Sequence, residues 1–276
     1  MDFSPVPPTE RIEPEQVAPD TYLIHQLQPA LGAPLSVYIN SMVITGAEPV
    51  IVDTGTIANR KQWLDDAFSL VEPEDVKWVF VSHDDIDHTG NLEEVMGACV
   101  NATLVASWAI VERHTNAFDF PLERTRWIND GETFDVGDRV LRAVRPPFWD
   151  SPTTRGLYDS STGVYWAVDA FATPMPTAPV ASVAELEPTF WRDGSVMFAH
   201  HAVAPWLGLV DATKYSEHID RIQVMGARTI VSAHSPVIPE AYVPAAFEIV
   251  RDLPGITPPA VPDQSVLDAV LGGVEA

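Results

Sequence analysis

The chain has 276 residues, of which 46% are hydrophobic and 20% charged, an ordinary composition for a folded protein with a substantial core. Its formal net charge of −23, without any run of Lys or Arg, argues against nucleic acid and against anionic membrane surfaces as partners. The single cysteine, Cys99, excludes an intramolecular disulfide and a thiolate-rich zinc site, so any metal must be held by histidines and carboxylates. Neither a secretory leader pattern nor an apolar stretch of about 18 residues occurs, which predicts a cytoplasmic protein.

Strands alternate with helices along the chain after an irregular, Pro-rich lead-in at residues 1–20. Runs of β-branched and apolar residues bounded by Gly or Pro predict strands at residues 21–26, 36–45, 48–53, 76–82, 102–106, 139–144, 163–168 and 228–232. Helical spacing of apolar residues predicts helices at residues 59–70, 91–97 and 211–226, and residues 108–130 are expected to be mostly helical. The alternation predicts an α/β sandwich at residues 21–253, followed by a Pro-rich C-terminal tail at residues 254–276.

The densest group of ionisable side chains follows the predicted strand at residues 76–82. Two imidazoles and three carboxylates fall within six residues, in the order His83, Asp84, Asp85, Asp87 and His88. Behind a buried strand, such groups would repel and desolvate one another unless a cation neutralised them. Ligand-binding residues collect at the carboxyl ends of strands in α/β folds, so this segment predicts a metal site. The alternative is a solvated acidic turn beside a helix N-terminus.

This run resembles the H-x-H-x-D-H signature of the metallo-β-lactamase superfamily, with Asp85 in place of the second His. With a carboxylate at this position, the motif resembles that of the flavodiiron proteins and their oxygen-binding diiron relatives, which is H-x-E-x-D-H. The resemblance implies a metallo-β-lactamase αββα sandwich with two metal ions. A carboxylate in place of an imidazole hardens the site and shifts its preference from zinc toward iron, with manganese as a further alternative.

Three further motifs follow in the order of the superfamily, each after a predicted strand. The turn V-D-T-G resembles the early Asp-x-Gly element, which implies that Asp53 supports the ligands without binding metal. The segment A-V-D-A-F around Asp169 is similar to the flavodiiron segment whose carboxylate bridges both metals. The segment S-A-H-S-P around His234 resembles the last element of the signature, whose His binds the second metal. The resemblance therefore implies these metal ligands: His83, Asp85, Asp87, His88, Asp169 and His234.

One ligand of the family is missing from the sequence. Flavodiiron proteins have a His in a segment like H-W-P-D-S, whereas the matching stretch here, P-P-F-W-D-S, places Phe148 at that position. Four alternatives remain open: Asp150 is a substitute ligand, a His of the pair His200 and His201 takes that place, the first metal position keeps three protein ligands and water, or that position stays vacant. Phe148, Trp149 and His201 are candidate pocket residues.

The resemblance leaves three functions open. The diiron branch binds oxygen or nitric oxide and reduces it, and Asp85 favours that branch. Other members of the superfamily are metal-dependent hydrolases of esters, lactones or thioesters, and Phe148 favours a zinc or mononuclear enzyme of this kind. The third alternative is a degenerate, non-catalytic binding module.

The expected electron supply also follows from the resemblance. Flavodiiron proteins carry a flavodoxin-like domain after this module, and no phosphate-cradling Gly/Ser/Thr loop is visible in this sequence. We therefore expect no flavin in this chain and a separate redox protein as its electron donor. The resemblance also implies a homodimer, because flavodiiron relatives deliver the flavin across a dimer interface.

Overall fold

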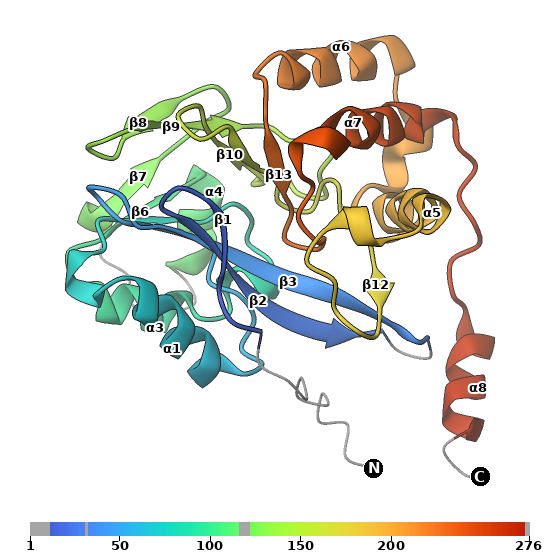
Figure 1. Cartoon of the computed structure of the whole chain (residues 1–276), viewed down its shortest axis with the longest axis horizontal. Helices are drawn as coiled ribbons and strands as arrows, with labels where there is room; N and C mark the ends of the chain where they lie inside the picture. Colours follow the sequence, from blue (N-terminus) through green and yellow to red (C-terminus); the bar gives the residue numbers. More distant parts are fainter. Residues whose placement is uncertain (1–11, 31–32, 116–121, 274–276) are drawn as a thin grey trace.

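The computed structural model describes residues 12–30, 33–115 and 122–273. Two β-sheets pack face to face, and helices cover the outer face of each sheet (Figure 1). The helices α1 (Arg60–Leu70) and α3 (Leu92–Ala98) lie over the first sheet, and α6 (Ala212–Gln223) and α7 (Val243–Asp252) lie over the second. The predicted αββα sandwich is therefore confirmed.

The first sheet has eight strands in the order β1-β2-β3-β4-β5-β6-β7, with β12 beside β3. Strands β1 to β4 pair antiparallel, and β4 to β7 run parallel to one another. Because parallel strands end at one edge of a sheet, the segments after β4 and β5, which carry Asp53 and His83, begin side by side. The strands are β1 (Glu15–Ala18), β2 (Thr21–Pro29), β3 (Leu35–Ile44), β4 (Val50–Val52), β5 (Trp78–Phe80), β6 (Thr103–Ala106), β7 (Thr125–Trp127) and β12 (Met175–Pro176).

The second sheet has five strands in the order β13-β11-β10-β9-β8. Its strands β11 and β13 are parallel neighbours. The segments that follow these two strands carry Asp169 and His234, so the sheet also brings these two residues together. The strands are β8 (Thr133–Asp135), β9 (Val140–Val144), β10 (Gly156–Asp159), β11 (Val164–Trp166) and β13 (Thr229–Val231).

Three apolar layers hold the sandwich together: one under the helices of the first sheet, one between the sheets, and one under the helices of the second sheet. Large aromatic side chains fill them, for example Trp63 in the first layer, Trp166 in the second and Tyr165 in the third. The remaining helices and helical turns are α2 (Ile86–Thr89), α4 (Trp108–His114), α5 (Pro188–Phe198), α8 (Gln264–Gly273), η1 (Pro73–Asp75), η2 (Leu122–Arg124), η3 (Val183–Glu185), η4 (Ala199–Val203), η5 (Pro205–Leu209), η6 (Glu240–Tyr242) and η7 (Leu253–Gly255).

Two local expectations differ from the structure. The lead-in at residues 1–20 was expected to be irregular, and its first 11 residues lie outside the described ranges, but β1 pairs with β2 through a turn in which Asp20 adopts φ 58°. Residues 108–130 were expected to be mostly helical, yet α4 ends at His114 and the described part of the stretch continues into β7. Thr125 and Trp127 are good strand formers, and pairing with β6 determines their conformation.

The expected tail leaves the sandwich, and α8 stands apart from the two sheets (Figure 1). Most described side chains from residue 257 onward are exposed. Within the described ranges, none of the helices has the length and hydropathy needed to cross a membrane.

Candidate metal centre

A buried carboxylate lies behind the segment that follows β5. Gly55 adopts φ 61°, and a Cβ atom there would lie 2.2 Å from Oε1 of Gln26, so only glycine allows this tight turn. The preceding Asp53 is fully buried and accepts hydrogen bonds from the amide of Ser82, at 2.7 Å, and from its hydroxyl. Oδ2 of Asp53 also lies 2.9 Å from Nδ1 of His88. Asp53 thus orients His88 from the side opposite the metal ligands.

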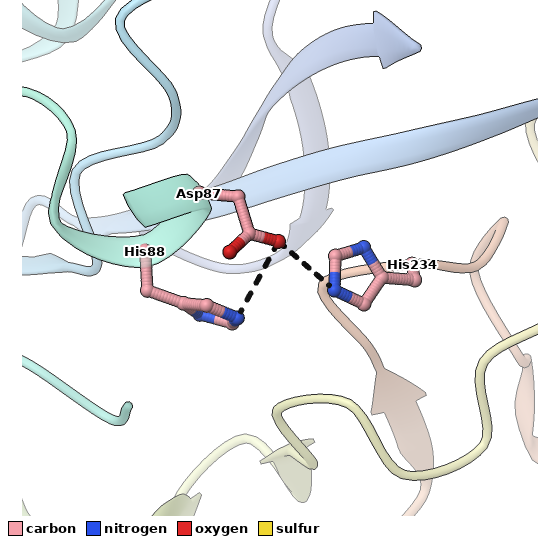
Figure 2. A group of neighbouring side chains, drawn as sticks. All are labelled: Asp87, His88 and His234. Atoms are coloured by element: carbon pink, nitrogen blue, oxygen red, sulfur yellow. Dashed lines mark ion pairs between the residues drawn. The ribbon is translucent and has the colours of Figure 1, made fainter. Parts of the chain in front are cut away.

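Three of the expected ligands form one compact group. The ligand atoms of Asp87, His88 and His234 all lie within 4.8 Å of one another (Figure 2). Oδ2 of Asp87 is 3.3 Å from Nε2 of His234 and 3.9 Å from Nε2 of His88. Nδ1 of His234 lies 2.9 Å from the carbonyl oxygen of Tyr38, which can only accept, so Nδ1 carries the proton. Nε2 is then the nitrogen directed at the group.

A second group consists of His83, Asp85 and Asp150. Nε2 of His83 lies 3.3 Å from Oδ2 of Asp85 and 3.2 Å from Oδ2 of Asp150. Phe148 is buried in the apolar layer under α5 to α7 and offers no ligand atom. The loop that contains Phe148 places Asp150, two residues later in the chain, opposite His83.

Asp169 lies between the two groups. Its Oδ1 is 3.0 Å from Nε2 of His88 and 3.0 Å from Nε2 of His234, and its Oδ2 is 3.9 Å from Nε2 of His83. Oδ2 is buried and has no hydrogen-bond partner among the described residues. A buried carboxylate oxygen without a partner is costly, and a cation on each side of Asp169 would satisfy both oxygens. The side chains of both groups therefore fit two metal ions.

The backbone around Asp169 is strained. Val168 has φ 58°, a conformation that a β-branched residue rarely adopts and that costs on the order of 1–3 kcal/mol. The carbonyl of Val168 accepts hydrogen bonds from the hydroxyl of Ser232, at 2.9 Å, and from the amide of Ala233, at 2.8 Å. These bonds join the turn after β11 to the turn after β13, so the strained conformation fixes Asp169 against His234.

The imidazoles and carboxylates of the centre shift one another's pKa values strongly. Burial alone would lower the pKa of His88, but the charges of Asp169 and Asp53, with their hydrogen bonds, raise it well above its usual range. Burial likewise opposes protonation of His83 and His234, and neighbouring carboxylates again raise both pKa values. The pKa of Asp169 is held well below its usual range, although burial acts in the opposite direction, because His88 and His234 lie beside it.

These shifts predict that metal binding releases protons. Without metal, the neighbouring carboxylates raise the pKa values of His83, His88 and His234 and so favour their protonated forms, whereas a metal ligand must be a neutral imidazole. Metal affinity should therefore rise with pH across the neutral range and fall as the solution becomes more acidic. Calorimetric titration with a divalent metal, in buffers of different ionisation enthalpy, measures the proton release. Binding heats that are independent of the buffer would contradict this prediction.

A cavity of about 260 Å³ opens over both groups. The metal-facing side chains form its floor, and its walls are mostly apolar, with Val37, Ile39, Phe198 and Val203 among them. The ring of Phe198 stacks on His234 at 5.4 Å. This small space with apolar walls suits a compact ligand more than a charged or extended one.

The three candidate pocket residues lie elsewhere. Phe148 is in the core, and Trp149 packs against Trp206 with ring centroids 5.5 Å apart. His201 lies on η4, a π-helical turn, and its Nε2 is 2.8 Å from the carbonyl oxygen of Pro259. His200 likewise contacts the carbonyl of Leu253, at 3.1 Å. Among the alternatives for the missing ligand, the geometry therefore favours Asp150 over both histidines.

Phe198, Ala202 and Val203 line the cavity and were not anticipated from the sequence. The segment from residue 188 to 198 has the periodicity of an amphipathic helix, which could have indicated α5. Its continuation into a π-helical turn, which aims these side chains at the metal-facing groups, has no local sequence signature.

Asp53→Asn is expected to weaken metal binding without unfolding the protein. Asn has nearly the same size as Asp, but its NH2 group is a hydrogen-bond donor. It would face the N–H groups of Ser82 and His88, which are donors as well. Loss of such a supporting carboxylate typically costs about 10–100-fold in metal affinity. Competition with a chromophoric chelator would measure the change, and an unaltered affinity would show that Asp53 does not orient His88.

Comparison with known proteins identifies the family. The model of the ODP family beta lactamase matches residues 37–234, which is more than half of the chain. The chain belongs to this family. The matched range includes all six expected metal ligands, from His83 to His234, together with Asp53 and Asp150.

Several relatives of this ODP-family chain are named as diflavin flavoproteins. It is 28% identical over 168 residues to "Putative diflavin flavoprotein A 2" of Nostoc sp., a match that covers 58% of this chain and 29% of that protein. The chain thus spans less than a third of the length of this relative. Two solved structures share the fold. One is a fragment of putative diflavin flavoprotein A 5 from Nostoc sp., with a TM-score of 0.75 and 16% sequence identity; the match covers 89% of this chain and 96% of that one. The other is rubredoxin oxygen:oxidoreductase from Desulfovibrio gigas, with a TM-score of 0.74 and 15% sequence identity; the match covers 87% of this chain and 61% of that one.

Proposed function

We propose that this ODP-family chain is a diiron protein that binds dioxygen or nitric oxide and reduces it with electrons from a separate protein. The observation that carries the proposal is the position of Asp169 between two groups of candidate ligands. The solved structure named as a rubredoxin oxygen:oxidoreductase supports dioxygen as the substrate and a protein as the electron donor.

The donor set favours iron over zinc. Four carboxylates, Asp85, Asp87, Asp150 and Asp169, contribute four negative charges, which balance two divalent cations. Three imidazoles complete the set, and no thiolate is available because Cys99 is buried in a different layer. Oxygen-rich donor sets with imidazole suit iron or manganese more than zinc.

In this proposal the chain's own residues hold, orient and shield the reacting groups. His83, Asp85 and Asp150 would hold one ion, Asp87, His88 and His234 the other, and Asp169 both. Two bound iron ions would supply the redox chemistry that none of these side chains can perform. The apolar walls of the cavity would admit a small uncharged molecule and limit the entry of water.

Anaerobic loading with ferrous iron tests the proposal. We expect about two iron ions per chain, since there are two ligand groups, and consumption of oxygen on an electrode when air-saturated buffer is added. The zinc-loaded protein is the control and should consume none. Retention of one zinc per chain, with turnover of an ester or lactone that is lost in His234→Ala, would support the hydrolase instead. Substoichiometric binding of every metal would support a non-catalytic binding module.

A further inference from the structure

Asp84 is the one carboxylate between His83 and His88 that belongs to neither ligand group. Its side chain is only 9% exposed, whereas that of the adjacent Asp85 is 64% exposed. A carboxylate removed from water in this way needs partners for both of its oxygens, because burial without them is costly. The ligand groups alone therefore leave the position of Asp84 unexplained.

Donors from two other segments of the chain surround the carboxylate of Asp84. Its Oδ1 accepts hydrogen bonds from the hydroxyl of Thr153, at 2.6 Å, and from the hydroxyl of Ser151, at 3.4 Å. Its Oδ2 pairs with the guanidinium of Arg113 in the last turn of α4. Because Ser151 and Thr153 lie on the loop that carries Asp150, Asp84 joins the segment after β5 to that loop and to α4.

These contacts restrain the loop close to Asp150. Asp150 directly precedes Ser151, whose hydroxyl donates to Asp84. A separate bond fixes the end of the loop, since the amide of Arg155 donates to the carbonyl oxygen of the residue before His83, at 2.8 Å. The loop is thus attached at two points beside His83, and these attachments keep Oδ2 of Asp150 at 3.2 Å from Nε2 of His83.

Asp84 also lies on the side of the His83 ring that faces away from the ligand group. Nε2 of His83 faces Asp85 and Asp150, so Nδ1 carries the proton when Nε2 binds a metal. Nδ1 lies 3.5 Å from Oδ1 of Asp84 and 3.5 Å from Oγ1 of Thr153. Since Thr153 gives its own proton to Asp84, its oxygen keeps lone pairs that can accept from Nδ1.

The other two imidazoles of the centre have an oxygen in the corresponding place. Nδ1 of His88 lies 2.9 Å from Oδ2 of Asp53, and Nδ1 of His234 lies 2.9 Å from the carbonyl oxygen of Tyr38. An oxygen behind a metal-binding imidazole fixes the tautomer and the orientation of the ring. His83 is the remaining imidazole, and its Nδ1 faces the oxygens of Asp84 and Thr153.

We propose that Asp84 is a positioning residue for the metal position bounded by His83, Asp85 and Asp150, which we call the first position. Together with Thr153 it orients the ring of His83, and through the loop it holds Asp150 within reach of the same ion. The inference rests on the two metal positions of the proposed function, but not on iron or on dioxygen.

Anaerobic titration with cobalt(II) tests the proposal, because cobalt(II) binds imidazole and carboxylate ligands and is paramagnetic. We expect Asp84→Ala to bind the ion at the first position about 10–100-fold more weakly. Asp84→Asn should lose less affinity, because Asn keeps an oxygen that accepts from Thr153. The ion held by Asp87, His88 and His234 should bind with the same affinity in both variants.

Proton NMR of the cobalt-loaded protein identifies which imidazole is affected. Each bound ring should give one strongly shifted Nδ1–H signal that disappears in D2O, so we expect three such signals from the wild-type chain. Asp84→Ala should lose the signal of His83, because its proton then exchanges rapidly with water. The signals of His88 and His234 should remain, since their partners are unchanged.

Thr153→Val is a second variant that keeps the test decisive if Asp84→Ala does not fold. Thr153 is buried, and Val has nearly the same size but no hydroxyl. Thr153→Val should also weaken binding at the first position, by about tenfold. The matched control is Asp159→Ala, because Asp159 likewise accepts from two hydroxyls and from an arginine, at the end of β10. It should lower the melting temperature and leave both cobalt affinities and all three signals unchanged.

Unchanged cobalt binding at the first position in Asp84→Asn and Thr153→Val would overturn the proposal. Equal weakening at both positions would overturn it as well, because that result would indicate a purely structural role of Asp84. A wild-type chain that binds no cobalt at the first position would contradict both this proposal and the two-metal site. Two bound ions without consumption of oxygen by the iron-loaded protein would contradict the proposed function alone, so the two failures are distinguishable.

Discussion

Asp169→Asn is expected to reduce bound iron from about two ions per chain to less than one. Asp169 is the residue that faces His83, His88 and His234 together, so its loss affects both ligand groups. Asn removes one negative charge and presents an amide donor to nitrogens that must themselves face the metal. Elemental analysis after anaerobic iron loading and desalting measures the effect.

A second buried aspartate provides the matched control. Asp159 accepts hydrogen bonds from Ser161, Thr162 and Arg139 at the end of β10, away from the ligand groups. Asp159→Asn should lower the melting temperature of the protein but leave the iron content unchanged. Asp169→Asn should lower the iron content and retain the circular dichroism of the metal-free fold. If Asp169→Asn still bound two iron ions, the claim that Asp169 is a ligand shared by both metal positions would be wrong.

Asp150→Ala is expected to remove one of the two ions and leave the other. Asp150 supplies the group around His83, whereas Asp87, His88 and His234 do not depend on it. Iron analysis should therefore give about one ion per chain. His234→Ala should remove the other ion, so the two variants deplete different positions.

Phe148→Leu is the control for the loop that carries Asp150. Phe148 is buried and offers no ligand atom, so a smaller apolar side chain should cost some stability and leave the iron content unchanged. Retention of both ions in Asp150→Ala would rule out Asp150 as the substitute for the missing family ligand. The first position would then be filled by His83, Asp85 and Asp169 with water.

The sequence best predicts the positions of those residues of the centre that directly follow a strand. Asp53, His83, Asp169 and His234 each come within a few residues of the end of a short buried strand. Their position depends on strand pairing, and apolar runs of β-branched residues reveal strands even without a structure. The sandwich and the meeting of these residues at one edge could therefore be predicted.

Features that depend on the path of a loop could not be predicted in this way. Asp150 faces His83 because Arg145 and Arg155 hold the carbonyls of Pro152 and Thr154, contacts that sequence spacing does not reveal. The same limit applies to the cavity wall, where a π-helical turn determines which side chains of residues 199–203 face the metal groups. The resemblance correctly named the family, and only the folded loop shows which carboxylate lies beside His83.

The strands missing from the prediction are short or lie at an edge. β1 follows a Pro-rich stretch, and β7 follows the residues 116–121 that the structure does not describe. Neither has the long alternation of apolar and polar residues that makes β2 and β3 recognisable, because edge strands owe their conformation mainly to pairing with one neighbour.

An anomalous difference map at the iron edge, from crystals of the iron-loaded protein, tests the central claim most directly. We expect two peaks per chain, one bounded by His83, Asp85 and Asp150, the other by Asp87, His88 and His234, with Asp169 between them. A single peak, or iron bound away from Asp169, would contradict the diiron centre.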